Sequence, residues 1–160
     1  MANPYKTKHR AFWLVLFIVY SGAMLWLLFD RPSSWANGTS YAQLLAQNIN
    51  MLPLLTIRNY WSVVQAGTDA NPELFRHCVI NLVGNVALFV PAGILLPKLF
   101  PSLRKLPVYF FSCAGIIFLI ESVQLYTLRG SFDVDDVILN LLGMTIGFAL
   151  YQLGGLFRRS

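Results

Sequence analysis

The stretch AFWLVLFIVYSGAMLWLLF, residues 11–29, decides the fold class because it continues for 19 residues without a charge. An α-helix needs about 20 apolar residues to cross the ~30 Å hydrocarbon core of a bilayer. Basic residues precede this run, as they precede the apolar core of a secretory signal peptide, but that core usually has only about 7–15 residues. We therefore expect an uncleaved membrane-spanning helix here.

The composition of the whole chain agrees with a bilayer as its solvent. Of its 160 residues, 56% are apolar and only 12% are charged, against about 25% charged in an average soluble domain. The net charge of +5 does not indicate a nucleic-acid partner, because the basic residues stand in small groups beside apolar runs and form no single patch. Cys78 and Cys113 lie in or beside apolar segments, and we expect them to be small buried hydrophobic residues.

Three further apolar runs follow, at approximately residues 77–97, 107–128 and 134–157. Together with residues 11–29 they predict an all-α membrane protein, a bundle of four transmembrane helices in one domain of residues 1–160. Pro91 lies inside the second run, where proline is expected to kink a membrane helix.

The distribution of lysine and arginine predicts the orientation, since these residues concentrate in cytoplasmic segments. They gather before the first run, between the second and third runs, and after the fourth run: Lys6, Lys8, Arg10, Lys98, Arg104, Lys105, Arg158 and Arg159. The other connections, together with the start of the fourth run, carry six of the seven acidic residues of the chain. We therefore expect a cell-membrane protein with both termini in the cytoplasm.

The first outer loop, Asp30–Arg76, is too long for a simple turn. Its apolar part, residues 41–57, contains several amides and Pro53, which weakens the alternative of a fifth crossing. We expect a partly helical, interfacial or re-entrant segment, with Trp35, Tyr41, Tyr60 and Trp61 as interface anchors.

Polar side chains inside the apolar runs are the candidate functional residues, because a polar group in hydrocarbon needs a partner or a function. Counting ~1.5 Å per residue from the proposed outer boundaries puts most of them about 6–12 Å into the outer half of the membrane. The candidate cluster is Asn81, Asn85, Glu121, Gln124, Arg129, Asp133, Asp136 and Asn140.

Structural interpretations compete with functional ones at these positions. The amides can hydrogen-bond one another, while Gly143 and Gly147 allow two helices to approach closely. Glu121 favours a functional role, because a carboxylate at this depth needs a partner, which we expect to be Arg129 or a cation. The acidic turn before the fourth run also fits a solvated helix N-terminus, the interpretation we prefer for Asp135.

The combined pattern resembles the VanZ-like family, and the resemblance covers roughly residues 11–153. The matching elements are residues 50–56 (NMLPLLT), 81–85 (NLVGN), 89–93 (FVPAG), 121–124 (ESVQ), Arg129, 133–143 (DVDDVILNLLG) and Gly147. Ala92 departs from the bulkier residue usual in the family. Helix-packing residues expected within these elements are Gly84, Pro91, Gly93, Gly143 and Gly147.

The resemblance implies a multi-pass membrane protein, associated in some members with reduced susceptibility to teicoplanin-type lipoglycopeptides, and implies no established reaction. Our first hypothesis is a cell-envelope protein whose outward polar pocket binds a lipid-linked cell-wall precursor or a lipoglycopeptide. The alternative is a membrane enzyme acting on a lipid head group, with a divalent cation at Glu121, Asp133 and Asp136. A third hypothesis is a small transporter, which needs a homo-oligomer formed through the Gly143/Gly147 face. No recognised catalytic motif is present, and no cofactor is expected.

Overall fold

The computed structural model describes residues 4–30, 39–68 and 71–156, with side chains from residue 10 to residue 155. Several residues used in the predictions therefore lie outside the described part, either entirely or by their side chains: Trp35, Phe157, Arg158 and Arg159 entirely, and Lys6 and Lys8 by their side chains.

Four helices in the described part of the chain are long and apolar enough to cross a membrane, and each contains all or nearly all of one predicted run. They are α1 (Pro4–Phe29), α4 (Pro72–Leu99), α5 (Leu106–Tyr126) and α6 (Val134–Leu156). Helices are the expected form because a bilayer core offers no water to satisfy backbone N–H and C=O groups. The prediction of an all-α membrane protein with four spans is confirmed.

The outer loop between α1 and α4 is partly helical, as predicted. It contains α2 (Tyr41–Gln47), β1 (Ile49–Asn50) and α3 (Leu55–Ala66), while η1 (Pro101–Arg104) joins α4 to α5 and β2 (Phe132–Asp133) precedes α6. The short strands β1 and β2 pair in parallel, with Asn50 opposite Asp133. This pairing ties the outer loop to the start of α6.

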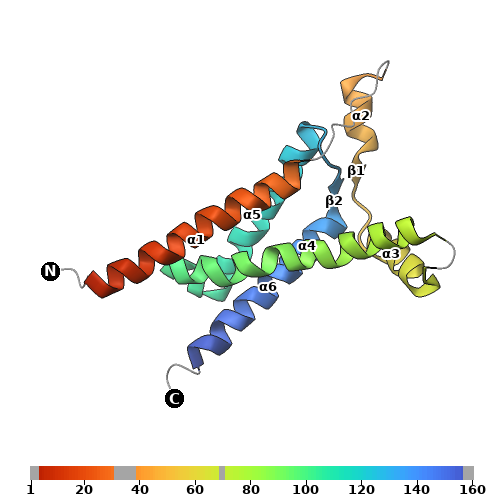
Figure 1. Cartoon of the computed structure of the whole chain (residues 1–160). Helices are drawn as coiled ribbons and strands as arrows, with labels where there is room; N and C mark the ends of the chain where they lie inside the picture. Colours follow the sequence, from red (N-terminus) through yellow and green to blue (C-terminus); the bar gives the residue numbers. More distant parts are fainter. Residues whose placement is uncertain (1–3, 31–38, 69–70, 157–160) are drawn as a thin grey trace.

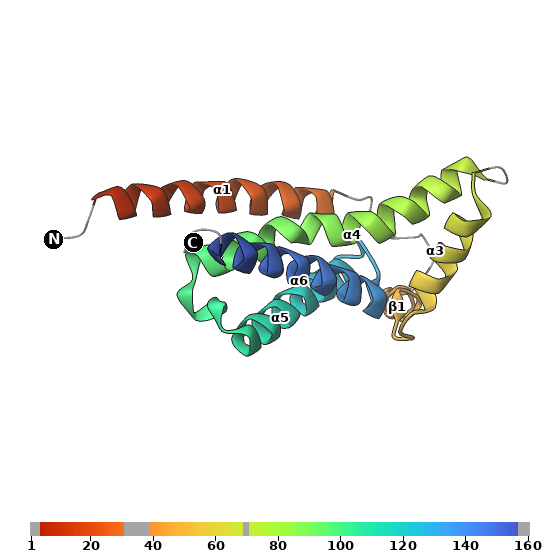
Figure 2. The same ribbon diagram turned by 90° about the horizontal axis from the view of Figure 1, so that it is seen from below.

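The two ends of the molecule differ in what they carry. In Figures 1 and 2 the described ends of the chain lie toward one end, whereas α2, β1 and α3 lie toward the opposite end. The end of α4 and the start of α1 also meet, because Arg10 and Lys98 line the same cavity. Both described chain ends lie at the same end of the molecule because the chain passes along it an even number of times.

Glycines let α4 and α6 cross at close range. A Cβ on Gly143 would collide with the carbonyl oxygen of Val86, and one on Gly147 would lie 2.8 Å from the Cα of Gly93. The expected packing role of Gly93, Gly143 and Gly147 is therefore realised within the chain. Within the chain, α4 occupies the Gly143/Gly147 face that the transporter hypothesis assigned to a homo-oligomer, and oligomerisation itself stays a prediction. Gly84 makes no such approach.

The buried core lies where α1, α4, α5 and α6 meet. Phe89 and Ile117 are fully buried there, and the Tyr109 hydroxyl donates to the carbonyl of Met144 at 2.8 Å. The helix α1 contributes less to this core and attaches to α4 through the Tyr20 hydroxyl, which donates to Leu88 O at 2.6 Å. The free thiols of Cys78 and Cys113 are buried, as expected.

Proline does not end α4. The helix continues through Pro91 and Pro97 to Leu99, although each proline removes one backbone N–H from the helical ladder. Membrane helices tolerate such interruptions when neighbouring groups satisfy the released carbonyls. At the end of the helix, the Arg104 Nε donates to Pro97 O at 3.0 Å and so satisfies a carbonyl of the last turn, which has no partner in the helix.

Candidate functional site

Asp135 fixes the outer loop onto α6. Its carboxylate is 0% exposed and accepts the backbone N–H groups of Leu54 at 2.5 Å and Ile57 at 3.0 Å. These amides belong to the first turn of α3, where a carboxylate is favoured by the helix dipole. Leu54 has a positive φ of 64°, a conformation that an L-residue adopts only with support.

The interpretation of Asp135 as a residue of a solvated turn is therefore wrong. It does stand in the first turn of α6, but its side chain is buried against a segment about 80 residues earlier in the chain. We call Asp133, Asp135 and their loop partners Asn50, Leu54, Thr56 and Ile57 the acidic clamp.

Asp133 is the second carboxylate of the acidic clamp. Its Oδ2 accepts the Thr56 hydroxyl at 2.7 Å and the Asn50 amide at 3.2 Å, while its Oδ1 accepts the backbone N–H of Asp135 at 2.8 Å. These bonds connect the start of α6 to the outer loop. Asn50 and Thr56 lie in the 50–56 motif, and the sequence analysis did not assign them to the site.

A second group of polar side chains lies beside the clamp on α3, α4 and α6. The Asn85 amide donates to Asp136 Oδ1 at 2.6 Å, which joins α4 to α6. On α4, the Asn81 amide is 3.3 Å from both the Nε2 and the carbonyl oxygen of His77. The ring of His77 meets the ring of Tyr60 edge-on, with centroids 5.8 Å apart. We call Tyr60, His77, Asn81, Asn85 and Asp136 the outer polar surface.

The electrostatics of Tyr60 place it close to the carboxylates. Burial raises the pKa of the Tyr60 phenol above 10.0, and the negative charge of Asp136 raises that pKa further, with a smaller effect from Asp133. A phenolate near these charges would be repelled. Tyr60 was predicted only as an interface anchor, and His77 only as a boundary residue; no sequence spacing signals their contact, which depends on how α3 folds back onto α4.

Asn85 lies nearer the start of α6 than the depth count predicted. The depth count put it at the level of Asn140, but it contacts Asp136, one helical turn earlier on α6. The correction leaves Glu121 and Asn140 as the deepest polar pair.

Glu121 and Asn140 meet in the core, as the depth count predicted. Glu121 is 3% exposed and Asn140 is 1% exposed, and the Asn140 amide donates to Glu121 Oε1 at 3.2 Å. No described residue donates to the buried Asn140 Oδ1. This pair joins α5 to α6 in the core.

Gln124 and Arg129 contact the end of α1. Gln124 is buried and donates from Nε2 to Leu28 O at 3.0 Å, while Arg129 donates from Nη1 to Phe29 O at 2.6 Å. Carbonyls in the last turn of a helix have no partner in that helix, so these donors cap α1. The structural interpretation accounts for these two contacts.

The predicted cation set is not assembled. Among residues 4–30, 39–68 and 71–156, no three histidine, cysteine, aspartate or glutamate side chains come together as metal ligands. Asp133 bonds to the outer loop, Asp136 to Asn85, and Glu121 to Asn140. The eight candidate residues thus divide into a clamp, an outer polar surface, a buried pair and a helix cap.

The comparisons with known proteins agree with the sequence resemblance. Protein VanZ of Enterococcus faecium is 33% identical over 100 residues, which cover 62% of this chain and 60% of that protein, so the match spans less than two thirds of the relative. No solved structure matches the chain. The family model described as VanZ/LLP1 matches residues 17–157, which contain all four membrane-spanning helices in whole or in large part. The chain belongs to the VanZ/LLP1 family.

Proposed function

We propose that this protein acts in the cell envelope by binding the polar head group of a lipid-linked cell-wall component at the outer polar surface. Binding there lowers susceptibility to teicoplanin-type lipoglycopeptides, which act on cell-wall precursors outside the membrane. The observation that carries the proposal is the contact of Asn85 with Asp136 beside Tyr60 and His77, which gathers polar groups from three helices at one end of the bundle.

The positions of the basic residues support an outward orientation of the end that carries the outer polar surface. Lys98 lies in the last turn of α4, and Arg104 and Lys105 follow between α4 and α5, all at the end where α1 begins. Basic residues concentrate on the cytoplasmic side of membrane proteins. The acidic clamp and the outer polar surface belong to the opposite end, and so face the compartment in which the cell wall is assembled.

The surroundings of the outer polar surface suit an amphiphile. Large apolar side chains near it are exposed, among them Leu54, Ile80 and Val83. In a membrane such side chains face lipid tails, so a lipid-linked ligand can remain in the bilayer while its head group meets hydrogen-bonding groups. Asn81, Asn85 and Asp136 are each partly exposed, which leaves them within reach of a head group.

The acidic clamp supports this surface without binding the ligand. Its two carboxylates are buried and hydrogen-bonded to the outer loop and to α6. By fixing the first turn of α3, the clamp sets the position of Tyr60 on the same helix. Asp133 and Asp135 therefore act as positioning residues for Tyr60.

Drug susceptibility tests the proposal in a sensitive Gram-positive host expressing the native chain or Asp136→Asn at matched membrane levels. Asparagine keeps an acceptor for Asn85 but removes the charge at the outer polar surface. We expect the native chain to protect against teicoplanin and Asp136→Asn to lose most of that protection. The control Glu73→Gln removes a carboxylate from the exposed first turn of α4 and should leave protection unchanged.

Two results would contradict the proposal. Equal protection by Asp136→Asn and the native chain would remove the outer polar surface from the function. Loss of protection in Glu121→Gln, with Asp136→Asn unaffected, would transfer the function to the buried pair of α5 and α6.

A further inference from the structure

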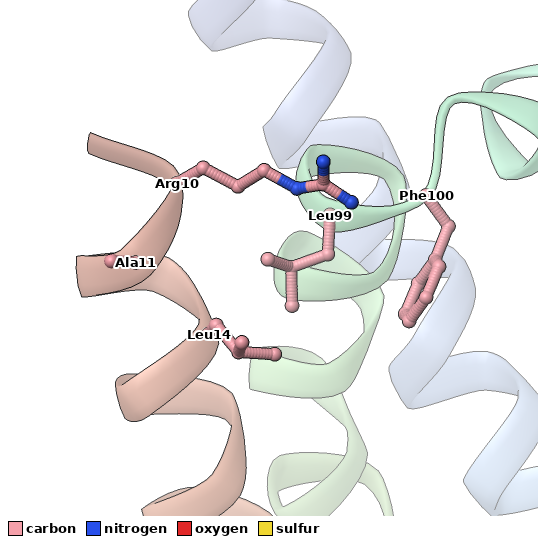
Figure 3. A pocket seen from close by; sticks show the side chains of 5 residues that line it. All are labelled: Arg10, Ala11, Leu14, Leu99 and Phe100. Atoms are coloured by element: carbon pink, nitrogen blue, oxygen red, sulfur yellow. The ribbon is translucent and has the colours of Figure 1, made fainter. Parts of the chain in front are cut away.

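Two adjoining cavities lie at the opposite end of the molecule from the outer polar surface. They have volumes of about 230 and 310 Å³ and share Arg10 and Leu99 in their walls. Figure 3 shows the smaller one, with the Arg10 side chain reaching from α1 toward the end of α4 and with Leu14 and Phe100 along its apolar side. The junction of α1, α4 and η1 forms both cavities.

The walls of the cavities combine positive charge with apolar surface. Arg10, Lys98 and Arg104 line the larger cavity, and none of the described residues that line either cavity is acidic. Lys98 Nζ lies 3.7 Å from the centre of the Trp13 ring, a cation–π contact that holds the ammonium group in place.

Arg104 is also held in position. Its Nε donates to Pro97 O at 3.0 Å, which uses one of the five N–H donors of a guanidinium group. Arginine binds phosphate oxygens through paired donors, and a guanidinium already fixed by one bond loses less side-chain entropy on binding.

The cavities lie at one end of the apolar helices, where a bilayer spanned by these helices would have its phosphate groups. Arg10 directly precedes the uncharged run of residues 11–29, and Leu99 is the last residue of α4. Trp13 stands about one helical turn deeper than Arg10, in the interfacial zone where tryptophan is enriched. The three basic groups therefore stand where the head groups of one leaflet meet the protein.

We propose that this junction binds the phosphodiester head group of an anionic phospholipid in the cytoplasmic leaflet. The basic groups pair with the phosphate, while Leu14 and Phe100 meet the start of the acyl chains. The larger volume is at the lower end of the ~300–1,000 Å³ of small-ligand pockets, and the smaller one is below that range, which fits a head group with its tails left in the bilayer. Basic pockets between helices on this side of a membrane are suited to anionic lipids.

Lipid binding to the purified full chain in non-ionic detergent tests the site. Native mass spectrometry would compare phosphatidylglycerol, which is anionic, with zwitterionic phosphatidylcholine. The variants are Arg10→Gln and Arg104→Gln, and the control is Lys105→Gln, which removes an exposed basic residue at the same end that lines neither cavity. Each arginine removed should weaken phosphatidylglycerol binding about fivefold, and Lys105→Gln should not.

Further measurements separate the site from a folding defect and from a free-anion site. In the native chain, the preference for phosphatidylglycerol should fall as salt rises, since ionic attraction is screened; this needs no variant. Equal binding of both lipids by the native chain would overturn the proposal, and so would unchanged binding in both arginine variants. Displacement of phosphatidylglycerol by excess inorganic phosphate alone would assign the site to a free anion and overturn the lipid assignment.

Discussion

Asp135 shows how one buried carboxylate can hold together segments that are distant in sequence. It accepts two backbone N–H groups of the first turn of α3, and one of them belongs to Leu54, whose left-handed backbone needs support. A buried N–H without an acceptor costs about 1–3 kcal/mol. The position of α3, and with it that of Tyr60, therefore depends on Asp135.

Asp135→Ala removes both acceptors and should reduce the local stability of the outer loop by about 1–3 kcal/mol. Hydrogen exchange of the Leu54 and Ile57 amides measures this directly, and both should exchange faster. Glu73→Ala is the control, because its carboxylate is exposed and pairs with Arg76 in the same helix. Unchanged exchange in Asp135→Ala would show that the outer loop is held by other contacts.

Tyr60 reports on the charge of the outer polar surface. Its raised pKa is caused first by burial and next by Asp136, so Asp136→Asn should move that pKa back toward 10.0. Because the folded-state pKa is above the unfolded value, the stabilising contribution of the neutral phenol is fully present below pH 10.0 and is lost as pH rises through the folded pKa. A titration of ¹³C-labelled tyrosine, with Tyr60→Phe to assign the signal, measures both effects. A normal Tyr60 pKa in the native chain would separate it from the carboxylates.

At the level of helices, the crossing of α4 and α6 is the most extensive contact in the bundle. It depends on glycine at Gly93, Gly143 and Gly147, where backbones approach without intervening side chains. In a bilayer, helix association gains little from hydrophobic burial, so this close backbone packing contributes a large share of the bundle's stability.

Gly143→Ala should destabilise the bundle by about 1–3 kcal/mol, because the new methyl group overlaps the Val86 carbonyl and forces the helices apart. Gly115→Ala is a matched control on α5, where an added Cβ meets nothing within 4 Å. That change should be neutral or stabilising by up to ~1 kcal/mol. Thermal unfolding of the purified variants in detergent compares them. Equal stability of the two variants would contradict the crossing.

The helices could be predicted from the sequence because an apolar run long enough to cross a bilayer usually does so as an α-helix. The partners of the polar residues were harder to predict, since a depth count gives no rotation of one helix against another. It placed Glu121 near Asn140 correctly, but it could not show that Gln124 turns to a carbonyl of α1. The burial of Asp135 was missed because its partners Leu54 and Ile57 carry no polar side chain that signals the contact.

Across the whole molecule, α3 and β1 lie at the end opposite the two described chain ends, with the long helices between them (Figure 2). The acidic clamp and the outer polar surface belong to the end of α3, whereas Arg10, Lys98 and Arg104 line a cavity at the other end. Each end holds side chains suited to a different ligand: hydrogen-bonding amides and a carboxylate at one, and arginines with an apolar wall at the other. The orientation of the protein decides which leaflet each end meets.

Cysteine labelling tests that orientation. Gln65 and Lys105 are both exposed and lie at opposite ends, whereas the native Cys78 and Cys113 are buried. A membrane-impermeant maleimide should label Gln65→Cys in intact cells and should label Lys105→Cys only after the membrane is opened. The reverse pattern would place the outer polar surface in the cytoplasm and remove its access to cell-wall precursors.

The most direct test of the proposed function is binding of a lipid-linked cell-wall precursor to the purified protein in detergent, measured for the native chain, Asp136→Asn and Glu73→Gln. We expect the native chain and Glu73→Gln to bind the precursor equally. Asp136→Asn should bind at least about tenfold more weakly, since a hydrogen bond to a charged group contributes about 1.5–3 kcal/mol. Equal binding by all three proteins, or no binding by the native chain, would contradict the assignment of the outer polar surface as the ligand site.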